Sequence, residues 1–210
     1  MDAEVFRAWI VSAAGVIEAN RDHLTQLDAA IGDADHGINL TRGFTAVLGA
    51  LGASAPTTPG AILTVTGTTL ISKVGGASGP LYGTAFRRAG KALGDAADVD
   101  LPALSAALDA ALAGVQQLGA AREGDKTMVD ALAPATRAFS EAIAAGASQD
   151  DALTTLAEAA RAGAVATIPL QALKGRASYL GPRSVGHEDP GAVSTALILG
   201  ALRDVARVRR

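Results

Sequence analysis

The chain has 210 residues, a formal net charge of −3 and no cysteine. Because domains commonly hold about 100–200 residues, we expect one domain over residues 1–210. The lack of cysteine excludes disulfide scaffolds, cysteine-ligated zinc and thiol nucleophiles, and the slightly acidic balance argues against a nucleic-acid-binding protein. No apolar run reaches the ~18 residues of a membrane span, and the first residues lack a basic signal region, so a cytoplasmic location is expected.

Hydrophobic residues make up 49% of the chain and aromatic ones only 3%, a composition rich in alanine and leucine that favours closely packed helices. Apolar spacing predicts helices over residues 3–27, 38–51, 59–73, 79–94, 101–119, 126–146, 149–171 and 190–208. Asp100 and Ser148 stand where N-caps are expected, and only residues 61–65 leave a strand open. The predicted fold is all-α, a single-domain bundle or barrel of about eight antiparallel amphipathic helices.

Four connections between the predicted helices are richer in glycine and polar residues than a turn requires. They are residues 27–39, 74–80, 122–130 and 174–191. In an up-and-down bundle, every second connection lies at the same end of the bundle. We therefore expect a functional site where these connections meet.

The first of these connections contains three aspartates, Asp28, Asp33 and Asp35. Their carboxylates repel one another unless a cation lies among them, and hard oxygen ligands suit Mg²⁺ or Ca²⁺ better than zinc. An EF-hand is excluded, because no glutamate falls at the required position. Helix capping and solvation explain the same residues equally well, so the spacing alone leaves metal binding open. His36, beside them, is expected to be a hydrogen-bonding partner rather than a ligand.

The second connection reads GGASG over residues 75–79 and is followed by Pro80, which suits the first turn of a helix. Free backbone N–H groups at such a helix start favour anions, although a flexible turn explains the same residues. The fourth connection carries Lys174, Arg176 and Arg183, either for phosphate oxygens or as ordinary surface charge. An acidic loop, an anion cradle and an arginine loop are together the parts of a magnesium–nucleotide site.

Other catalytic arrangements are not supported. Ser72, Ser78 and Ser184 lack a His/Asp pair in a nucleophile elbow, which argues against a serine hydrolase. Trp9 is expected in the core, and His23 is expected to be structural or exposed.

Four blocks of sequence resemble the nucleotide-binding L subunits of dihydroxyacetone kinase (DhaL type): LDAAIGDADHGINLTRGF, VGGASGPLYGTAF, GDKTMVDALAP and KGRASYLGPRSVGHEDPGA. The resemblance extends from residue 27 to residue 192 and implies an all-α barrel of eight helices with the nucleotide at one end. It implies that Asp28, Asp33 and Asp35 hold two Mg²⁺ ions. The ADP or ATP contacts that it implies are His36, Gly37, Ile38, Asn39, Ala77, Ser78, Gly119, Met128, Arg176, Asp189, Pro190 and Gly191. Gly119 lies in the segment that matches least.

The resemblance also implies a reaction, in which the γ-phosphoryl group of ATP passes to dihydroxyacetone bound to a histidine of a separate K subunit. Arg176 and the GGASG amides are then expected to stabilise transition-state charge, with no nucleophile or base from this chain. Two phosphoryl donors stay open. In the first variant, ADP stays bound and is rephosphorylated by a phosphotransferase-system protein that draws on phosphoenolpyruvate; a free-standing L chain resembles this variant more often. In the second variant, ATP exchanges as an ordinary substrate.

Three alternatives also stay open. The acceptor is dihydroxyacetone or a related small ketose or sugar. From other classes of protein, a non-catalytic nucleotide-binding adaptor fits the same motifs, and a purely structural helical bundle predicts no nucleotide binding.

Overall fold

The computed structural model describes residues 1–208, which fold into nine α-helices and one 3₁₀ helix. The helices are α1 (Ala3–Ala19), α2 (Arg21–Ile31), α3 (His36–Ser54), α4 (Pro59–Lys73), α5 (Ser78–Leu93), α6 (Leu101–Gly119), α7 (Val129–Ala144), α8 (Gln149–Ala166), η1 (Arg176–Ser184) and α9 (Pro190–Val208). The all-α prediction is confirmed, and residues 61–65 lie inside α4. Over these residues, no helix has both the length and the apolar character needed to cross a membrane.

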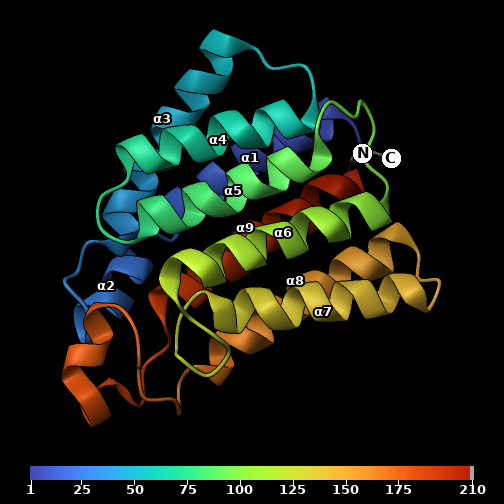
Figure 1. The fold of residues 1–210 in the computed structure, drawn as a ribbon. Coiled ribbons are helices and arrows are strands. Elements are labelled where there is room, and N and C mark those ends of the chain that lie inside the picture. Colours follow the sequence, from blue (N-terminus) through green and yellow to red (C-terminus); the bar gives the residue numbers. More distant parts are fainter. Residues whose placement is uncertain (209–210) are drawn as a thin grey trace.

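Eight helices form a closed ring, in which α1 packs on α3, each later helix packs on the next, and α9 returns to α1 (Figure 1). Short connections make successive helices antiparallel, as in other helical bundles. The ring corresponds to the predicted barrel of about eight helices. The remaining two helices, α2 and η1, lie outside it, at the end opposite the N-terminus (Figure 1).

The hydrophobic core fills the inside of this ring and includes residues from α1 to α9. Its few aromatic rings pack together, with Trp9 centred 5.8 Å from both Phe6 and Phe86. The indole N–H of Trp9 donates to the carbonyl of Ile198 at 2.8 Å, so the buried polar atom has a partner. Trp9 is therefore a core residue, as expected.

The predicted first helix, residues 3–27, is wrong in extent, because Asn20 separates α1 from α2. The side-chain amide of Asn20 donates to the carbonyl of Val16 at 2.8 Å. Asparagine side chains compete in this way with the backbone bonds of a helix. The chain changes direction there, and α2 carries the acidic residues out to one end of the ring.

Two other predicted helices are also shorter in the structure. The helix expected over residues 126–146 begins at Val129, because Lys126 has a φ of 61°, outside the helical region. The helix expected over residues 149–171 ends at Ala166, shortly before Pro169, which lacks the N–H that a helix interior needs. Both corrections lengthen connections at the end of the ring where the site lies.

Candidate functional site

Four connections meet at one end of the ring, as the alternation of the helices predicts. They are α2–α3, α4–α5, α6–α7 and α8–α9, and they border a pocket of about 630 Å³. This volume lies in the range of ~300–1,000 Å³ that is usual for small-molecule sites. The predicted site residues that line the pocket are Asp28, Asp33, Asp35, His36, Ala77, Ser78, Gly119, Met128, Arg176, Asp189, Pro190 and Gly191.

Three predicted nucleotide contacts do not line the pocket. Gly37 is buried, and a Cβ there would overlap the backbone of Arg21. Ile38 is 52% exposed. The side-chain oxygen of Asn39 accepts from Nη2 of Arg42 at 2.8 Å. The start of α3 therefore presents only His36 to the pocket.

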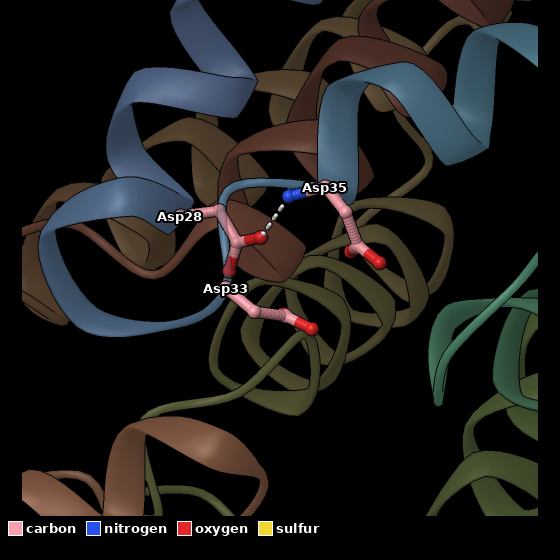
Figure 2. A group of neighbouring side chains, drawn as sticks. All are labelled: Asp28, Asp33 and Asp35. Carbon is pink, nitrogen blue, oxygen red and sulfur yellow. Dashed lines mark hydrogen bonds between the residues drawn. The ribbon is translucent and has the colours of Figure 1, made fainter.

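The three aspartates lie together around the turn between α2 and α3 (Figure 2). One carboxylate oxygen of each lies within 4.8 Å of the other two. Oδ2 of Asp28 accepts from the backbone N–H groups of Asp35 at 2.8 Å and His36 at 3.1 Å. These bonds hold Asp28 in place and leave its Oδ1 without a backbone donor.

Two backbone features allow this turn to be so tight. A Cβ at Gly32 would overlap Oδ1 of Asp28, so the space beside that carboxylate requires glycine. Ala34, between the other two aspartates, has a φ of 61°, which costs a non-glycine residue of order 1 kcal/mol or more. Backbone strain of this kind is often stored at functional sites.

The acidic group suits a divalent cation. Three carboxylates whose oxygens converge to within 4.8 Å of one another are hard oxygen donors, and Mg²⁺ prefers such donors together with phosphate oxygens. The cation that pairs with the group in the structure is Arg176, whose Nε lies 2.9 Å from Oδ2 of Asp33. The guanidinium is 68% exposed, so it neutralises the group only in part. The residues present therefore fit magnesium.

The α4–α5 connection faces the acidic group across the pocket. Gly76 turns the chain with a φ of 65°, and Ala77 then leads into α5, which begins at Ser78. A Cβ at Gly79 would overlap the carbonyl of Val74, so the loop and the helix start are closely packed. The first N–H groups of an α-helix have no partner within the helix and carry partial positive charge. This side of the pocket is therefore suited to an anion.

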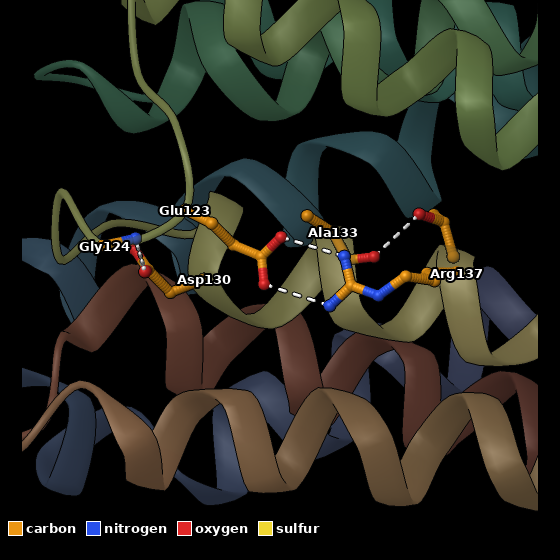
Figure 3. A network of polar contacts seen from close by, with 6 residues as sticks. Glu123, Gly124, Asp130, Ala133 and Arg137 are labelled. Carbon is orange, nitrogen blue, oxygen red and sulfur yellow. Dashed lines mark hydrogen bonds and ion pairs between the residues drawn. The ribbon is translucent and has the colours of Figure 1, made fainter.

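The α6–α7 connection is held by side chains of α7 (Figure 3). The carboxylate of Asp130 accepts from the backbone N–H groups of Gly124 at 2.5 Å and Thr127 at 2.7 Å. Arg137 donates from both terminal nitrogens to Glu123, at 3.0 and 3.1 Å, and this pairing lowers the pKa of Glu123. The loop that leads to Met128 is thus held by side-chain hydrogen bonds and an ion pair rather than by secondary structure of its own.

Lys126 joins this loop to the α8–α9 connection. The lysine is only 1% exposed, and its Nζ donates to the carbonyls of Thr167 at 2.9 Å, Leu170 at 3.1 Å and His187 at 2.6 Å. Burial lowers the pKa of Lys126, while the charge of Asp189 opposes that shift. A buried ammonium is costly unless it is well bonded, and here it holds the segment that carries Arg176.

Two titratable groups at the inner wall of the pocket have strongly shifted pKa values. Burial lowers the pKa of His36 to about 4, although Asp28 opposes this shift, so the imidazole is neutral at pH 7. Burial raises the pKa of Asp189 to about 7, and a hydrogen bond from the backbone of Ala192 opposes the rise. Perturbed groups that face a cleft are typical of functional sites.

Sequence reasoning assigned no role to several residues of this end of the ring. Lys126, Asp130 and Tyr82 stand in blocks that carry the family resemblance but were given no role there, and Ser194 and Thr195 had no local signal. Among the basic candidates, Lys174 lines the pocket with Arg176, whereas Arg183 is exposed outside it. His23 is exposed on α2, as one of the two expectations for it allowed.

Comparison with known proteins identifies the family. Residues 30–204 match the model of the DAK2 domain. The chain belongs to this family. Over 199 residues this DAK2 domain is 42% identical to the Escherichia coli K12 protein named "PEP-dependent dihydroxyacetone kinase, ADP-binding subunit DhaL", with 95% of each chain covered. It is 39% identical over 197 residues to the "PTS-dependent dihydroxyacetone kinase, ADP-binding subunit DhaL" of Lactococcus lactis, with 94% of each covered.

A solved structure is similar as well. The dihydroxyacetone kinase from C. freundii, in complex with AMP-PNP and Mg²⁺, superposes with a TM-score of 0.71 at 29% identity. The match covers 97% of this DAK2 domain and 34% of that chain, so our chain spans about a third of the solved one. The resemblance to DhaL subunits inferred from four sequence blocks is thereby confirmed.

Proposed function

We propose that this DAK2 domain is the ADP-binding subunit of a dihydroxyacetone kinase, which transfers the γ-phosphoryl group of ATP to dihydroxyacetone held by a separate K subunit. The observation that carries the proposal is the pairing of three converging carboxylates with the start of α5 across one pocket. A magnesium nucleotide needs both a hard-ligand metal site and an anion site, and phosphoryl transfer depends on little else than positioning and charge. The end-to-end similarity to DhaL subunits supports the same function.

In this proposal Asp28, Asp33 and Asp35 hold two Mg²⁺ ions, which neutralise phosphate charge when bound. Asp28 is fixed by two backbone N–H groups, so its free oxygen is aimed before any ligand arrives. Arg176 lies beside Asp33 and is exposed, so it is placed to bind an outer phosphate oxygen.

The remaining contacts divide into polar and apolar groups. Ala77 and Ser78 are proposed to bind phosphate through the start of α5, while Asp189, Pro190 and Gly191 close the inner wall. Gly119 and Met128 border the pocket together with Leu81, Val115 and Ala121, and this apolar side suits a purine base. The family resemblance also implies nucleotide contacts at Gly37, Ile38 and Asn39. We propose that these residues act through their backbone or support the residues that line the pocket.

The phosphoryl donor is proposed to be a protein of the phosphotransferase system, with ADP as a bound cofactor. The relatives that support this choice are named as dependent on phosphoenolpyruvate or on that system. Free ATP, and a related ketose or sugar as the acceptor, are the alternatives. We also propose that residues 1–210 form one domain. We further propose that the protein acts in the cytoplasm, and cell fractionation tests this location.

The first experiment is to denature the freshly purified protein and to identify the released nucleotide and metal by chromatography and elemental analysis. Stoichiometric ADP with about two Mg²⁺ per chain supports the bound-cofactor form, and an empty protein that binds added Mg-ATP supports exchange. A protein that binds neither Mg-ADP nor Mg-ATP contradicts the proposal.

A variant and a partner complete the test. Asp33→Asn is expected to abolish Mg-nucleotide binding in calorimetry while the far-ultraviolet circular dichroism stays unchanged, with Asp22→Asn on the exposed face of α2 as the control. Dihydroxyacetone phosphate is expected to form only when a K subunit is added. Nucleotide binding without any such turnover favours the adaptor alternative.

A further inference from the structure

A row of hydrogen-bonded side chains leads from the pocket into the interior between α3, α5 and α9. Nδ1 of His36 lies 3.0 Å from Oγ of Ser78, and Nε2 lies 2.8 Å from Oγ of Ser194. Beyond them, Oη of Tyr82 lies 2.6 Å from Oγ of Ser194 and 2.9 Å from Oγ1 of Thr195. Ser78 is partly exposed at the pocket, and the other four residues are at most 7% exposed. We call these five residues the hydroxyl–imidazole row.

The direction of one bond in this row limits the direction of the next. The row also has carbonyl acceptors beside it, because Ser194 can donate to Pro190 at 2.9 Å or Gly191 at 3.1 Å, and Thr195 can donate to Gly191 at 2.8 Å. A hydroxyl donates one hydrogen, and a neutral imidazole donates from one nitrogen and accepts at the other. In an inward direction, Ser78 donates to His36, whose Nε2–H donates to Ser194. Ser194 then donates to Tyr82, which donates to the carbonyl of Gly191 at 3.0 Å. In this direction the hydroxyl hydrogen of Ser78 is donated to His36, so toward the pocket the Ser78 oxygen can only accept hydrogen bonds.

The outward direction reverses the bonds that join Ser78, His36, Ser194 and Tyr82. Thr195 donates to Tyr82, and Tyr82 donates to Ser194. Ser194 donates to Nε2 of His36, so the imidazole hydrogen is on Nδ1 and is donated to Ser78. The hydroxyl hydrogen of Ser78 is then free to point into the pocket. Both directions satisfy all five side chains, so the packing alone allows either.

A phosphate group in the pocket selects between these directions, because its oxygens only accept hydrogen bonds. We propose that Tyr82 and Ser194 are positioning residues, which hold His36 as its Nδ1–H tautomer when phosphate is bound, so that Ser78 donates to the phosphate. This inference rests on the proposed function, which places the nucleotide phosphates at Ser78. A hydrogen bond from the Ser78 hydroxyl to a charged phosphate is stronger than one from the same hydroxyl to the neutral imidazole of His36. Bound phosphate therefore favours the outward direction.

The tautomer of His36 tests the proposal directly. The probe is Mg-ADP added to protein with ¹⁵N-labelled histidine, and two-bond ¹H–¹⁵N spectra report which ring nitrogen carries the hydrogen. The other two histidines, His23 and His187, are exposed and are assigned by replacing each with glutamine. The expected result is a hydrogen on Nδ1 of His36 in the bound protein. A hydrogen on Nε2, or on both nitrogens, overturns the proposal.

Calorimetry on the same samples separates this inference from the proposed function. If Mg-ADP does not bind, the proposed function fails and this inference fails with it. If Mg-ADP binds while the hydrogen of His36 is on Nε2, the proposed function stands and only the role of the row is wrong.

A double-mutant cycle distinguishes positioning from a merely structural role. Tyr82→Phe removes the hydroxyl and keeps the buried ring, and we expect the Kd for Mg-ADP to rise about three- to tenfold, the usual effect of one hydrogen bond. In a Ser78→Ala background the same change is expected to have almost no further effect, because the hydroxyl that it orients is gone. An equal loss in both backgrounds overturns the proposal.

Two further variants keep this test interpretable. Thr66→Val removes another fully buried hydroxyl, which donates to the carbonyl of Ile62 within α4, and is expected to leave the Kd unchanged. If Tyr82→Phe does not fold, Ser194→Ala enters the same cycle in its place. The coupling to Ser78 is expected to be the same, and its absence overturns the proposal.

Discussion

Nε of Arg176 lies 2.9 Å from Oδ2 of Asp33, so η1 is paired with the acidic turn between α2 and α3. Both side chains are solvent-exposed to a large extent, 68% for the arginine and 36% for the aspartate, and an exposed pair contributes little to stability. The ion pair matters because it positions Arg176. The pair keeps the only arginine that lines the pocket, within the described residues, at the edge of the acidic group.

Arg176→Gln is expected to raise the Kd for Mg-ADP about tenfold or more, because a phosphate loses a charged hydrogen-bonding partner. The free energy of unfolding in urea, without nucleotide, is expected to stay within about 0.5 kcal/mol of the parent value, since the ion pair is exposed. Arg88→Gln, at an exposed arginine of α5 that does not line the pocket, is the control. An unchanged Kd for the Arg176 variant would argue against a phosphate contact.

Lys126→Met is expected to lower the free energy of unfolding by roughly 2–4 kcal/mol, because three carbonyls lose their common donor. Amide hydrogen exchange in residues 167–189 is expected to accelerate, since Lys126 holds that segment to the α6–α7 loop. Lys91→Met, at an exposed lysine of α5, is the matched control and should change stability by less than ~0.5 kcal/mol. A loss below about 1 kcal/mol for Lys126→Met would contradict the anchoring role.

Gly67→Ala tests the close contact of α4 with α5. An added Cβ would overlap the carbonyl of Gly83 and lie 2.7 Å from the backbone nitrogen of Arg87, so the helices must separate. Urea unfolding is expected to show a loss of roughly 1–3 kcal/mol. Gly49→Ala, inside α3 with nothing within 4 Å of the new Cβ, is expected to stabilise the protein by ~0.5–1 kcal/mol. Equal effects at the two positions would refute the packing explanation.

The raised pKa of Asp189 predicts a pH dependence of stability. Because the pKa is about 7 in the folded protein and 3.8 for the ordinary group, the folded state retains the proton over this range. Its contribution to stability is therefore full below pH ~4 and is lost as the pH rises toward 7. Lys126 opposes the shift, whereas Asp130 and Asp28 add to it.

Asp189→Asn removes this titration and keeps an oxygen that accepts from the backbone of Ala192. Relative to the parent, the variant is expected to gain stability between pH 4.5 and 7.5, by up to ~4 kcal/mol for a shift of this size. Urea unfolding at several pH values, without nucleotide, measures the difference. Asp109→Asn, at an exposed carboxylate of α6, controls for the loss of a charge. A constant difference across this range would show that Asp189 is ionised throughout.

Features that depend on neighbouring residues could be predicted from the sequence. The spacing of apolar residues predicted the ring helices, and the alternation of their connections predicted which four meet. Local sequence was enough to find the acidic turn, the GGASG loop and the connection that carries Arg176. The chemistry of each follows from the types of residue it contains. Local competition explains one failure, since the side chain of Asn20 ends α1 where the apolar pattern continues.

The tertiary structure alone decided which distant groups meet. Lys126 bonds to three backbone carbonyls, and a carbonyl has no signature in a sequence because every residue carries one. The partners of His36 lie on α5 and α9, and their hydroxyls became a row only when the ring closed. Ile38 and Asn39 come only two and three residues after His36, yet neither lines the pocket, because successive residues of α3 point in different directions. Residue order thus determined the helices and their motifs, while the packing of buried faces, which sums contacts across the whole chain, determined how the site was assembled.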